Sequence, residues 1–313
     1  MIREKSETRA VMNIQAIGNT ESDRQEGVPV KKFLVLTTLL VMSSMVMTGV
    51  TAAGASASSA AGAGAPMIGA KAGTHFGLPT VSENWSGYAV SGKTPFNYVS
   101  STFTVPTLTC NGMKDVYTSD WVGLDGFNDQ TVEQDGASGR CTVQSNYKLP
   151  YYYAWIEMYP AATVKEYKVQ PGDVITASVN YTGGMFNLTI TDVTSGETRT
   201  VSSACATCER ASAEWIIERP AGCDPFPTNC FLFALANFGT TTMSEDVARQ
   251  DGGSTTGLSA YPNAHQIFMI QPTKSGGFYT LDNVSAVDAA PNAFTVTWLK
   301  YGKVTPITLG PKS

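Results

Sequence analysis

The sequence predicts an all-β protein built as an antiparallel β-sandwich, and three observations support this fold class. Residues rich in β-branched and aromatic side chains form short runs, most of them with alternating apolar and polar positions. Gly, Pro, Asn and Asp separate these runs at short intervals, and no segment keeps a helical period. The predicted strands are residues 103–105, 174–181, 186–193, 213–218, 266–270 and 294–301.

Two turns and one irregular segment complete this pattern. Residues 192–196 (Asp-Val-Thr-Ser-Gly) predict a hairpin turn followed by a returning strand. Residues 301–303 (Tyr-Gly-Lys) lie between two β-rich runs and predict a second hairpin. Residues 243–249 are the one segment in which a single helical turn is expected.

The N-terminal region predicts a secretory signal. Lys31 and Lys32 precede an apolar run at 33–47, and residues 55–57 (Ala-Ser-Ala) offer a small-residue cleavage site. A membrane-spanning anchor is the alternative, but Thr and Ser pairs interrupt the run and small residues follow it. We therefore expect residues 1–57 to be a leader and signal peptide, and the mature protein to be secreted and free of the membrane.

The rest of the chain predicts one domain behind a short connecting segment. Residues 58–79 are rich in Ala, Gly and Ser, a composition that cannot bury a core, so they predict a linker or a short pro-segment. Residues 80–313 have a length that is typical of one all-β domain. We expect this β-sandwich domain to carry the function and to be a monomer.

The charge balance bears on partners and on the working environment. Residues 1–57 contain six of the 21 basic and five of the 26 acidic residues, which leaves 15 basic and 21 acidic ones and a net charge of −6. Nucleic acid is not expected as a partner, because phosphate contacts need clustered Lys and Arg and no basic run remains. Only 15% of residues are charged. A chain with few cations repels itself little in acid, so this composition suits an acid environment.

All six cysteines lie in the expected mature part of the chain. They are Cys110, Cys141, Cys205, Cys208, Cys223 and Cys230. An even number behind a secretory signal predicts disulfides. The C-x-x-C spacing of Cys205 and Cys208 also occurs in redox motifs and zinc sites, but those need a βαβ setting or a second cysteine pair, and neither is visible in the sequence. We therefore expect no metal and no cofactor.

Two segments with strand-like alternation carry acidic residues. In residues 151–159, a period of two places Glu157 on one face with Trp155 and three tyrosines, and Ala154 with Ile156 on the other. In residues 212–218, the same period places Glu214, Ile216 and Glu218 together. Each strand thus has a core face and a face that mixes carboxylates with apolar or aromatic side chains, which is typical of a substrate groove on a sheet.

The sequence also limits the kinds of active site. His75 and His265 are the only histidines and no G-x-S-x-G precedes His265, so a Ser–His triad is not expected. H-E-x-x-H, glycine-rich nucleotide motifs and the D-T/S-G of paired-aspartate proteases do not occur. Carboxylates must then move the proton in any enzymatic reaction, and Glu157, Glu214 and Glu218 are the candidates. A cluster of like charges among apolar side chains raises at least one carboxyl pKa, as a general acid or base requires, whereas the alternative is a set of solvated acids on an outward face.

The order of the motifs resembles that of the glutamic peptidase (eqolisin) family. In chain order the motifs are Asn84-Trp85-Ser86-Gly87, residues 96–106 ending in Val105-Pro106, Trp121-Val122-Gly123-Leu124-Asp125-Gly126, Gln134-Asp135-Gly136, residues 153–160 (Tyr-Ala-Trp-Ile-Glu-Met-Tyr-Pro) and Ala213-Glu214-Trp215-Ile216-Ile217-Glu218. They are similar to the family's N-W-x-G, its Val-Pro strand end, W-V-G-I-D-G, Q-T-G, A-W-Y-E-W-Y-P and A-E-F-I-I-E. The resemblance covers most of the chain from Thr80 onward. It implies two curved sheets in a lectin- or glucanase-like jelly roll, with the site on the concave sheet.

This resemblance also implies the chemistry, that of an acid endopeptidase that pepstatin does not inhibit. Glu218, in the place of the family's catalytic Glu, is expected to be the general base that takes a proton from water. Gln134, in the place of the family's catalytic Gln, is expected to orient that water and stabilise the oxyanion. The side chains expected to line or support the cleft are Trp121, Trp155, Glu157, Asp125 and Glu214.

The same resemblance leads to expectations for the disulfides, for Asp135 and for the first strand. Cys223 and Cys230 are similar to a cysteine pair that follows the catalytic Glu in the family. Cys110 and Cys141 flank the segment from 121 to 134 and are expected to pair with each other. Cys205 and Cys208 remain and form the third expected pair. Asp135 replaces the family's threonine, and this extra carboxylate beside Gln134 is expected to alter the pH dependence. Asn84 and Trp85 are expected to fix the register of the first core strand.

Two other functions fit a curved β-sandwich that bears carboxylates and aromatic side chains. A glycoside hydrolase would use Glu214 and Glu218 on one strand as its acidic pair, but its chemistry has no need of the Gln134 motif. A lectin-like carbohydrate-binding module would use the aromatic rings without catalysis. Its binding would survive the change Glu218→Gln.

Overall fold

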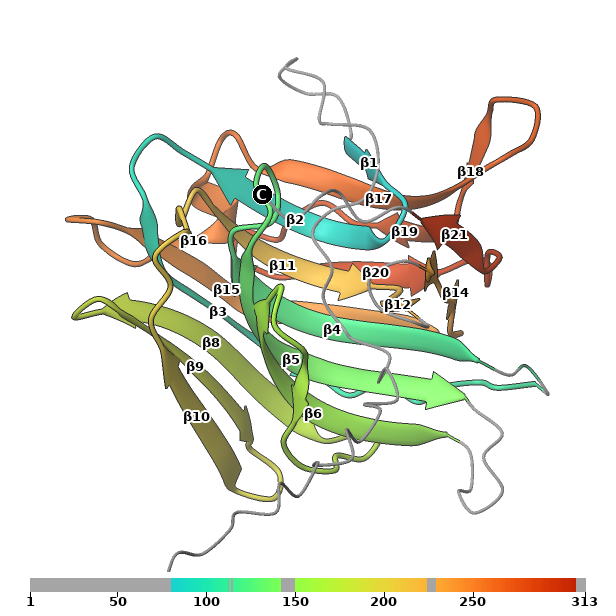
Figure 1. Ribbon diagram of the computed structural model, residues 1–313, viewed down its shortest axis with the longest axis horizontal. Helices are drawn as coiled ribbons and strands as arrows, with labels where there is room; N and C mark the ends of the chain where they lie inside the picture. Colours follow the sequence, from blue (N-terminus) through green and yellow to red (C-terminus); the bar gives the residue numbers. More distant parts are fainter. Residues whose placement is uncertain (1–79, 112, 114, 142–149, 224–228, 308–313) are drawn as a thin grey trace, which may run out of the picture. The chain divides into compact units, whose positions relative to one another are not determined.

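The structure is a computed structural model that describes residues 80–111, 113, 115–141, 150–223 and 229–307 (Figure 1). The expected signal peptide at 1–57 and the expected linker at 58–79 lie outside the described residues. Within the described ranges every regular element is a strand except one 3-10 helix, Leu258–Ala260. None of the helical structure in those ranges is long and apolar enough to cross a bilayer. The prediction of an all-β protein is confirmed.

One large sheet contains ten strands. They are β1 (Thr80–Ser82), β2 (Trp85–Ser91), β4 (Val116–Leu124), β5 (Val132–Cys141), β6 (Tyr151–Tyr159), β7 (Val164–Lys165), β11 (Ser212–Glu218), β14 (Ala234–Leu235), β17 (His265–Pro272) and β18 (Phe278–Thr280). Their order is β1-β17-β2-β11-β4-β5-β6-β7, with β14 beside β4 and β18 beside β17. The central pairs from β2 to β7 are antiparallel, so residues opposite one another on neighbouring strands point to the same face.

A second sheet contains eight strands, and a third is small. The eight are β3 (Phe96–Thr104), β8 (Val174–Thr182), β9 (Met185–Asp192), β10 (Glu197–Ser203), β15 (Thr240–Gln250), β16 (Thr256–Gly257), β19 (Asp282–Val284) and β20 (Phe294–Trp298). They follow the order β10-β9-β8-β3-β15-β20-β19, with β16 beside β15. The three-stranded sheet comprises β12 (Ala221–Cys223), β13 (Cys230–Leu232) and β21 (Thr305–Ile307). Figure 1 shows that the strands of the large sheets curve.

The hydrophobic core lies between the two large sheets, where β4 and β5 pack against β3, β8 and β9. Trp215 and Ile217 of β11 face this core, whereas Ile216 between them belongs to a separate cluster on the other face. The same alternation on β6 places Ile156 in the core and Trp155 in that separate cluster. Burying a large apolar side chain contributes about 1.5–3 kcal/mol to the stability of the fold, so the residues on the core face fix the register of each strand. That register also determines which side chains point away from the core. The predicted sandwich and the predicted faces are confirmed.

The predicted strands and one of the two predicted hairpins are present. Each of the six predicted runs overlaps a strand: β3, β8, β9, β11, β17 or β20. The hairpin at 192–196 joins β9 to the antiparallel β10. The Asp192 carboxylate accepts the backbone N–H groups of Thr194 at 2.9 Å and Ser195 at 3.2 Å, and Gly196 has a φ of 80°. Side-chain capping by Asp and a glycine with positive φ are what this turn requires.

The expectation of a helical turn at 243–249 is wrong, because these residues lie inside β15. The register of β15 with β3 shifts between Ser244 and Val247, and Glu245 has a φ of 57°. This bulge breaks the period of two. Asp246 therefore turns inward, is fully buried and accepts a hydrogen bond from Ser101 at 2.6 Å. The sequence of the segment loses its strand alternation for this reason.

The prediction of a hairpin at 301–303 is also wrong. Strand β20 ends at Trp298 in the eight-stranded sheet, and β21 pairs with β13 in the small sheet. Gly302 has a φ of 68°, and a Cβ there would lie 3.0 Å from Leu281 and 3.1 Å from Arg219. The glycine allows close packing where the chain passes from one sheet to another, rather than a two-strand turn.

The three expected disulfides are confirmed. Cys110–Cys141 ties the segment before β4 to the end of β5, and Cys223–Cys230 joins β12 to β13. Cys205–Cys208 lies in the loop between β10 and β11. These bonds fix the segments that lead into and out of the strands carrying Gln134 and Glu218.

Candidate active site

Glu218 is the last residue of β11, and residues on both sides of that strand donate to its carboxylate. Nε1 of Trp121 on β4 donates to Oε2 at 2.9 Å, and Nδ2 of Asn84, just before β2, donates to Oε1 at 3.2 Å. β11 lies between β2 and β4, and the antiparallel register places Trp85 and Ser119 opposite Glu218. The Glu218 side chain is fully buried. N–H donors favour the ionised form of a carboxyl group, so this site is arranged to hold a negative charge.

The position of Trp121 depends on two glycines. Gly136 lies opposite Trp121 on β5, and a Cβ on Gly136 would overlap the Cβ of Trp121. A Cβ on Gly123 would lie 2.9 Å from Cζ3 of the indole. Trp85 packs edge to face against the same ring, with centroids 5.0 Å apart. The glycines of the two motifs thus let the indole pack closely enough on the sheet to reach Glu218.

Gln134 on β5 is directly paired with Glu157 on β6. Nε2 of Gln134 donates to Oε2 of Glu157 at 2.8 Å, and Oγ1 of Thr163 donates to Oε1 at 2.6 Å. Gln134 is fully buried and Glu157 nearly so. Glu157 therefore holds the orientation of the Gln134 amide, and Thr163 holds Glu157.

The protonation of Glu157 is set by its surroundings. Burial raises the pKa of Glu157 well above the ordinary value of 4.5, the charge of Glu218 raises it further, and the hydrogen bonds from Thr163 and Gln134 lower it. The raised pKa favours the protonated form of Glu157, and the charge of Glu218 acts in the same direction. Neighbouring carboxyls with different surroundings are typical of acid–base sites.

Gln134 and Glu218 belong to one site through the residues between them. Gln134 is paired with Gly123 of β4, and Glu218 is paired with Ser119 of the same strand. These two β4 residues are four positions apart, which corresponds to about 13 Å along the strand. Trp121 lies between those positions: its nitrogen donates to Glu218 and its ring contacts Gly123, which faces Gln134. Glu157, bonded to Gln134, feels the charge of Glu218. The amide and the carboxylate are thus linked by one indole and one protonated acid.

Glu214 shares a face with Glu218, as the strand period predicts, but has a different environment. It is fully buried, and within the described residues neither of its carboxyl oxygens is in hydrogen-bonding geometry with a donor. Burial raises the pKa of Glu214 well above 4.5, and the nearby Ser212 hydroxyl lowers it by less. Glu214 is arranged to keep its proton.

Glu214 lies within a buried group of acids at the start of β5 and β11. Asp125, Asp129 and Glu133 all raise the pKa of Glu214 through their charges. Burial, followed by the charge of Asp125, raises the pKa of Glu133 to about 10, and burial raises that of Asp129 to about 7. Glu133 and Asp129 are therefore mostly protonated in acid solution.

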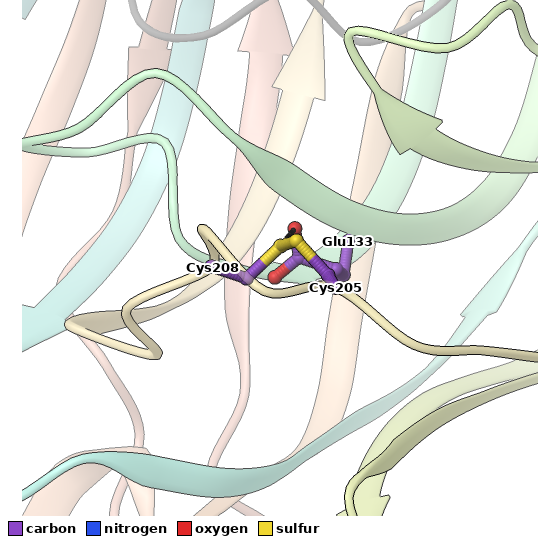
Figure 2. A group of neighbouring side chains, drawn as sticks. All are labelled: Glu133, Cys205 and Cys208. Atoms are coloured by element: carbon purple, nitrogen blue, oxygen red, sulfur yellow. Dashed lines mark hydrogen bonds between the residues drawn. A yellow bond between two sulfur atoms is a disulfide. The ribbon is translucent and has the colours of Figure 1, made fainter.

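The side chain of Glu133 points to the disulfide of the loop before β11 (Figure 2). Its Oε1 lies 2.8 Å from Sγ of Cys208, and one carboxylate oxygen and both sulfurs lie within 4.8 Å of one another. In the part of the chain that the structure describes, this is the one group of His, Cys, Asp or Glu close enough to hold a metal. Because Cys205 and Cys208 are bonded to each other, neither is the thiolate that a metal ligand must be.

Two other predicted site residues have supporting positions. Nε1 of Trp155 donates to Oγ of Ser119 at 3.1 Å, and its ring belongs to the cluster that contains Trp121. The Asp125 carboxylate accepts the backbone N–H groups of Arg210 at 2.7 Å and Ala211 at 2.6 Å. Trp155 therefore packs on the same face of the sheet as Trp121, whereas Asp125 anchors the loop that leads into β11.

Asp135 does not share a face with Gln134. It points between the two sheets, is fully buried and receives a 3.4 Å contact from the backbone N–H of Ser178 on β8. Burial raises the pKa of Asp135 well above its ordinary value. The expectation that this carboxylate lies beside the Gln134 amide is corrected, because adjacent residues of a strand point to opposite faces.

Sequence reasoning missed part of the constellation. Asn84 was expected only to fix strand register, yet it donates to Glu218. Its place in the N-W-x-G motif was the available signal. Thr163 and Ser119 gave no signal, because each meets its partner, Glu157 or Trp155, only through the pairing of the sheet.

Comparison with known proteins decides the family. A profile described as the Peptidase A4 family matches residues 83–298. The chain belongs to this family of glutamic peptidases. The resemblance of the motifs is thereby confirmed, and this Peptidase A4 member acts on protein or peptide substrates.

Solved structures of glutamic peptidases share the fold. Scytalido-glutamic peptidase with a transition state analog inhibitor is 22% identical, with a TM-score of 0.58 over 69% of this chain and 98% of that one. A second structure of that enzyme, with a peptide-based transition state analog, gives a TM-score of 0.57 at the same identity and coverage. Aspergilloglutamic peptidase from Aspergillus niger is 26% identical over 59% of this chain and 99% of that one, with a TM-score of 0.45. A search of curated protein sequences gives no match.

The surroundings of Glu214 and Glu218 favour the peptidase over the glycosidase alternative. The two acids are four residues apart on β11. Glu214 has other acids near it and a raised pKa, whereas Glu218 accepts two N–H groups. A glycosidase would need these two acids as a pair around one bond and has no need of the Gln134 motif.

Proposed function

We propose that this peptidase is a secreted, acid-acting endopeptidase in which Glu218 is the general base and Gln134 orients the attacking water and stabilises the oxyanion. The observation that carries the proposal is the pair of N–H donors, from Trp121 and Asn84, on the Glu218 carboxylate. A carboxylate held in its ionised form is what a general base must be. The protonated Glu157 beside it adds no competing negative charge.

The reaction uses one carboxylate and one amide. Glu218 takes a proton from a water molecule, whose oxygen attacks the scissile carbonyl carbon directly. The carbonyl oxygen becomes an oxyanion and accepts a hydrogen bond from the Gln134 amide N–H. Glu218 then gives its proton to the leaving nitrogen, the C–N bond breaks, and a carboxylic acid and an amine leave the site. No acyl-enzyme forms.

An amide suits the second position better than another carboxylate would. A negative group there would oppose the oxyanion, whereas an amide offers both an acceptor for water and a donor for the oxyanion. By accepting an N–H of Gln134, Glu157 fixes which end of the amide carries which role. A substitution at Glu157 that removes this hydrogen-bond acceptor would therefore affect the reaction through the orientation of the Gln134 amide.

The working conditions follow from this chemistry. Glu218 must be ionised at the start, and the leaving nitrogen must gain a proton at the end, so the activity optimum is acidic. Pepstatin resistance follows because the sequence has no D-T/S-G motif of the paired-aspartate enzymes. The apolar run behind Lys31 and Lys32 supports secretion. The substrates are proteins or peptides, the protein works as a monomer, and neither nucleic acid nor membrane is needed.

An assay with an unfolded protein substrate at acid pH tests the proposal. We expect cleavage that persists in pepstatin and falls at least about 1,000-fold in both Glu218→Gln and Gln134→Ala, since acid–base and oxyanion groups each contribute about that much. Circular dichroism of both variants checks that the fold is kept. Full activity of Glu218→Gln would contradict the proposal. Mass analysis of the protein from the culture medium tests secretion and shows whether the chain begins near residue 58 or 80.

A further inference from the structure

Two cations lie over neighbouring aromatic rings on the face of the sheet that carries Glu157. Nζ of Lys165 lies 4.3 Å from the ring centroid of Tyr153, and the guanidinium carbon of Arg140 lies 5.1 Å from that of Tyr151. The two tyrosine rings are 5.6 Å apart, so the cations cover adjacent rings. Such contacts favour a positive charge over the ring face.

Strand register places this pair at the edge of the active site. Lys165 pairs with Trp155 on β6, Trp155 with Gly136 on β5, and Gly136 with Trp121 on β4. Lys165 is therefore in the same row across the sheet as Trp121, the donor to Glu218. Three strand spacings separate the two residues, or about 14 Å.

Among the described residues, no carboxylate forms an ion pair with Arg140 or Lys165. Among the described residues the ion pairs are Arg199–Glu197 and Arg210–Asp251, and neither includes Arg140 or Lys165. Nε of Arg140 is buried without a hydrogen-bond acceptor in those residues. Burial, followed by the charge of Arg140, lowers the pKa of Lys165. Two positive charges that act on one another across adjacent rings favour the binding of an anion near them.

We propose that Arg140 and Lys165 form a subsite for a carboxylate of the substrate, from an Asp or Glu side chain or from the chain terminus. This inference rests on the proposed function, because it takes the substrate to lie across the strands from Glu218 toward β7. An extended chain needs about four residues to span 14 Å, so the carboxylate lies about four residues from the bond that is cut. The enzyme then prefers acidic segments of unfolded proteins.

A set of matched peptides tests this preference. Each has one cleavable bond and either Glu or Gln four residues before or after it, and a further pair ends in a free carboxylate or in an amide at that distance. At pH 5 a Glu side chain, with an ordinary pKa of about 4.3, is mostly ionised. For the wild-type protein we expect kcat/KM about tenfold higher for one carboxylate peptide than for its neutral match, a gain that falls with added salt. The two kinds of carboxylate peptide show which source is bound.

The double variant Arg140→Gln/Lys165→Gln removes both charges and keeps polar side chains of similar reach. We expect it to cleave acidic and neutral peptides equally and to cleave the neutral ones as the wild type does. Lys300→Gln is the matched control, because Nζ of Lys300 lies 5.0 Å from the ring centroid of Tyr279, the same kind of contact elsewhere on the surface. It should keep the full preference for acidic peptides.

Binding to Glu218→Gln separates failure of the subsite from failure of the proposed function. Fluorescence anisotropy of labelled peptides on this variant should show about tenfold tighter binding of the carboxylate peptide, lost when Arg140 and Lys165 are also changed. Equal affinity for acidic and neutral peptides, or a preference that survives the double change, would overturn the subsite and leave the Glu218 chemistry untouched. Cleavage by Glu218→Gln would overturn the proposed function, while the binding ratio still decides the subsite.

Discussion

Glu214 and Glu218 stand four residues apart on the same face of β11, and the fold gives them opposite surroundings. Glu218 accepts hydrogen bonds from Trp121 and Asn84. Glu214 accepts none from the described residues, and the charged groups that affect it are acids. Strand period makes the two residues equivalent, so the difference comes from the neighbouring strands. The donors come from Trp121 on β4 and from Asn84 just before β2, and they favour the ionised form at Glu218 rather than at Glu214.

The largest effect expected from this comparison is on catalysis. Glu218→Gln should lower kcat/KM by at least about 1,000-fold, whereas Glu214→Gln should lower it by less than about tenfold, because general acid–base catalysis is lost only in the first. Peptide cleavage at acid pH measures both. The comparison fails if the two variants lose activity to the same extent while both remain folded.

Trp121→Phe tests the donor rather than the acid. The ring stays, but the N–H that bonds to Oε2 of Glu218 is lost. Loss of a hydrogen bond to a buried charge costs about 1.5–3 kcal/mol, so activity should fall roughly 10- to 100-fold. The acidic limb of the pH–rate profile should also move to higher pH, because the ionised form of the base is less favoured. An unchanged profile would show that the indole acts only as packing.

Glu214→Gln should change the pH dependence of stability. In the folded protein burial raises the pKa of Glu214 well above 4.5, whereas the unfolded chain releases the proton near 4.5. The folded state thus binds more protons, so the stability that this group contributes is complete below pH 4.5 and is lost as pH rises toward the folded-state pKa. The loss therefore begins near pH 4.5 and grows as the pH rises toward neutrality.

Urea denaturation at pH 4 and pH 6 measures this effect. The wild type should lose stability between the two values, and Glu214→Gln should lose less. Asp120 and Asp282, whose pKa values burial raises to about 7, add to the wild-type loss in the same direction. A variant that is weakened equally at both pH values would show that Glu214 is ionised in the folded protein.

The smallest effect is expected at Asp135, which is adjacent to Gln134 in sequence and on the opposite face of β5. Asp135→Asn should leave kcat/KM within about twofold at every pH, because surface and core changes away from the reacting groups seldom alter the chemistry. Asp135→Asn should also reduce the loss of stability between acid and neutral pH, by the same reasoning as for Glu214. A shift of the activity optimum by a full pH unit would place the Asp135 charge within reach of the reaction.

The sequence was sufficient for those features that depend on residues close together in the chain. A period of two predicted the faces of β6 and β11. The choice of Gln134 and Glu218 came from the family resemblance and stays a prediction. Contacts made across the sheet were not predictable in this way. Thr163 reaches Glu157 only because the chain after β6 returns beside it, and Asn84 reaches Glu218 only because β2 lies next to β11.

The two errors in the fold have the same physical origin. The bulge at Glu245 removed the alternation that marks a strand, although pairing with β3 and β20 keeps the segment extended. Gly302 has the conformation of a turn residue, but its neighbours in space are Leu281 and Arg219 rather than a returning strand. In each case contacts between residues far apart in the sequence determined the local conformation, which the pattern of neighbouring residues did not specify.

Strand β7 ends the ten-stranded sheet with only two residues, and both are exposed. The edge of a sheet offers backbone N–H and C=O groups to any extended chain that comes near. A peptidase works among unfolded chains, which are the molecules best able to add themselves as a further strand. An edge this short, with Lys165 as one of its two residues, gives such a chain little length to pair with and a charge to accommodate. The edge of this sheet is therefore protected against unwanted strand pairing by its shortness and its charge.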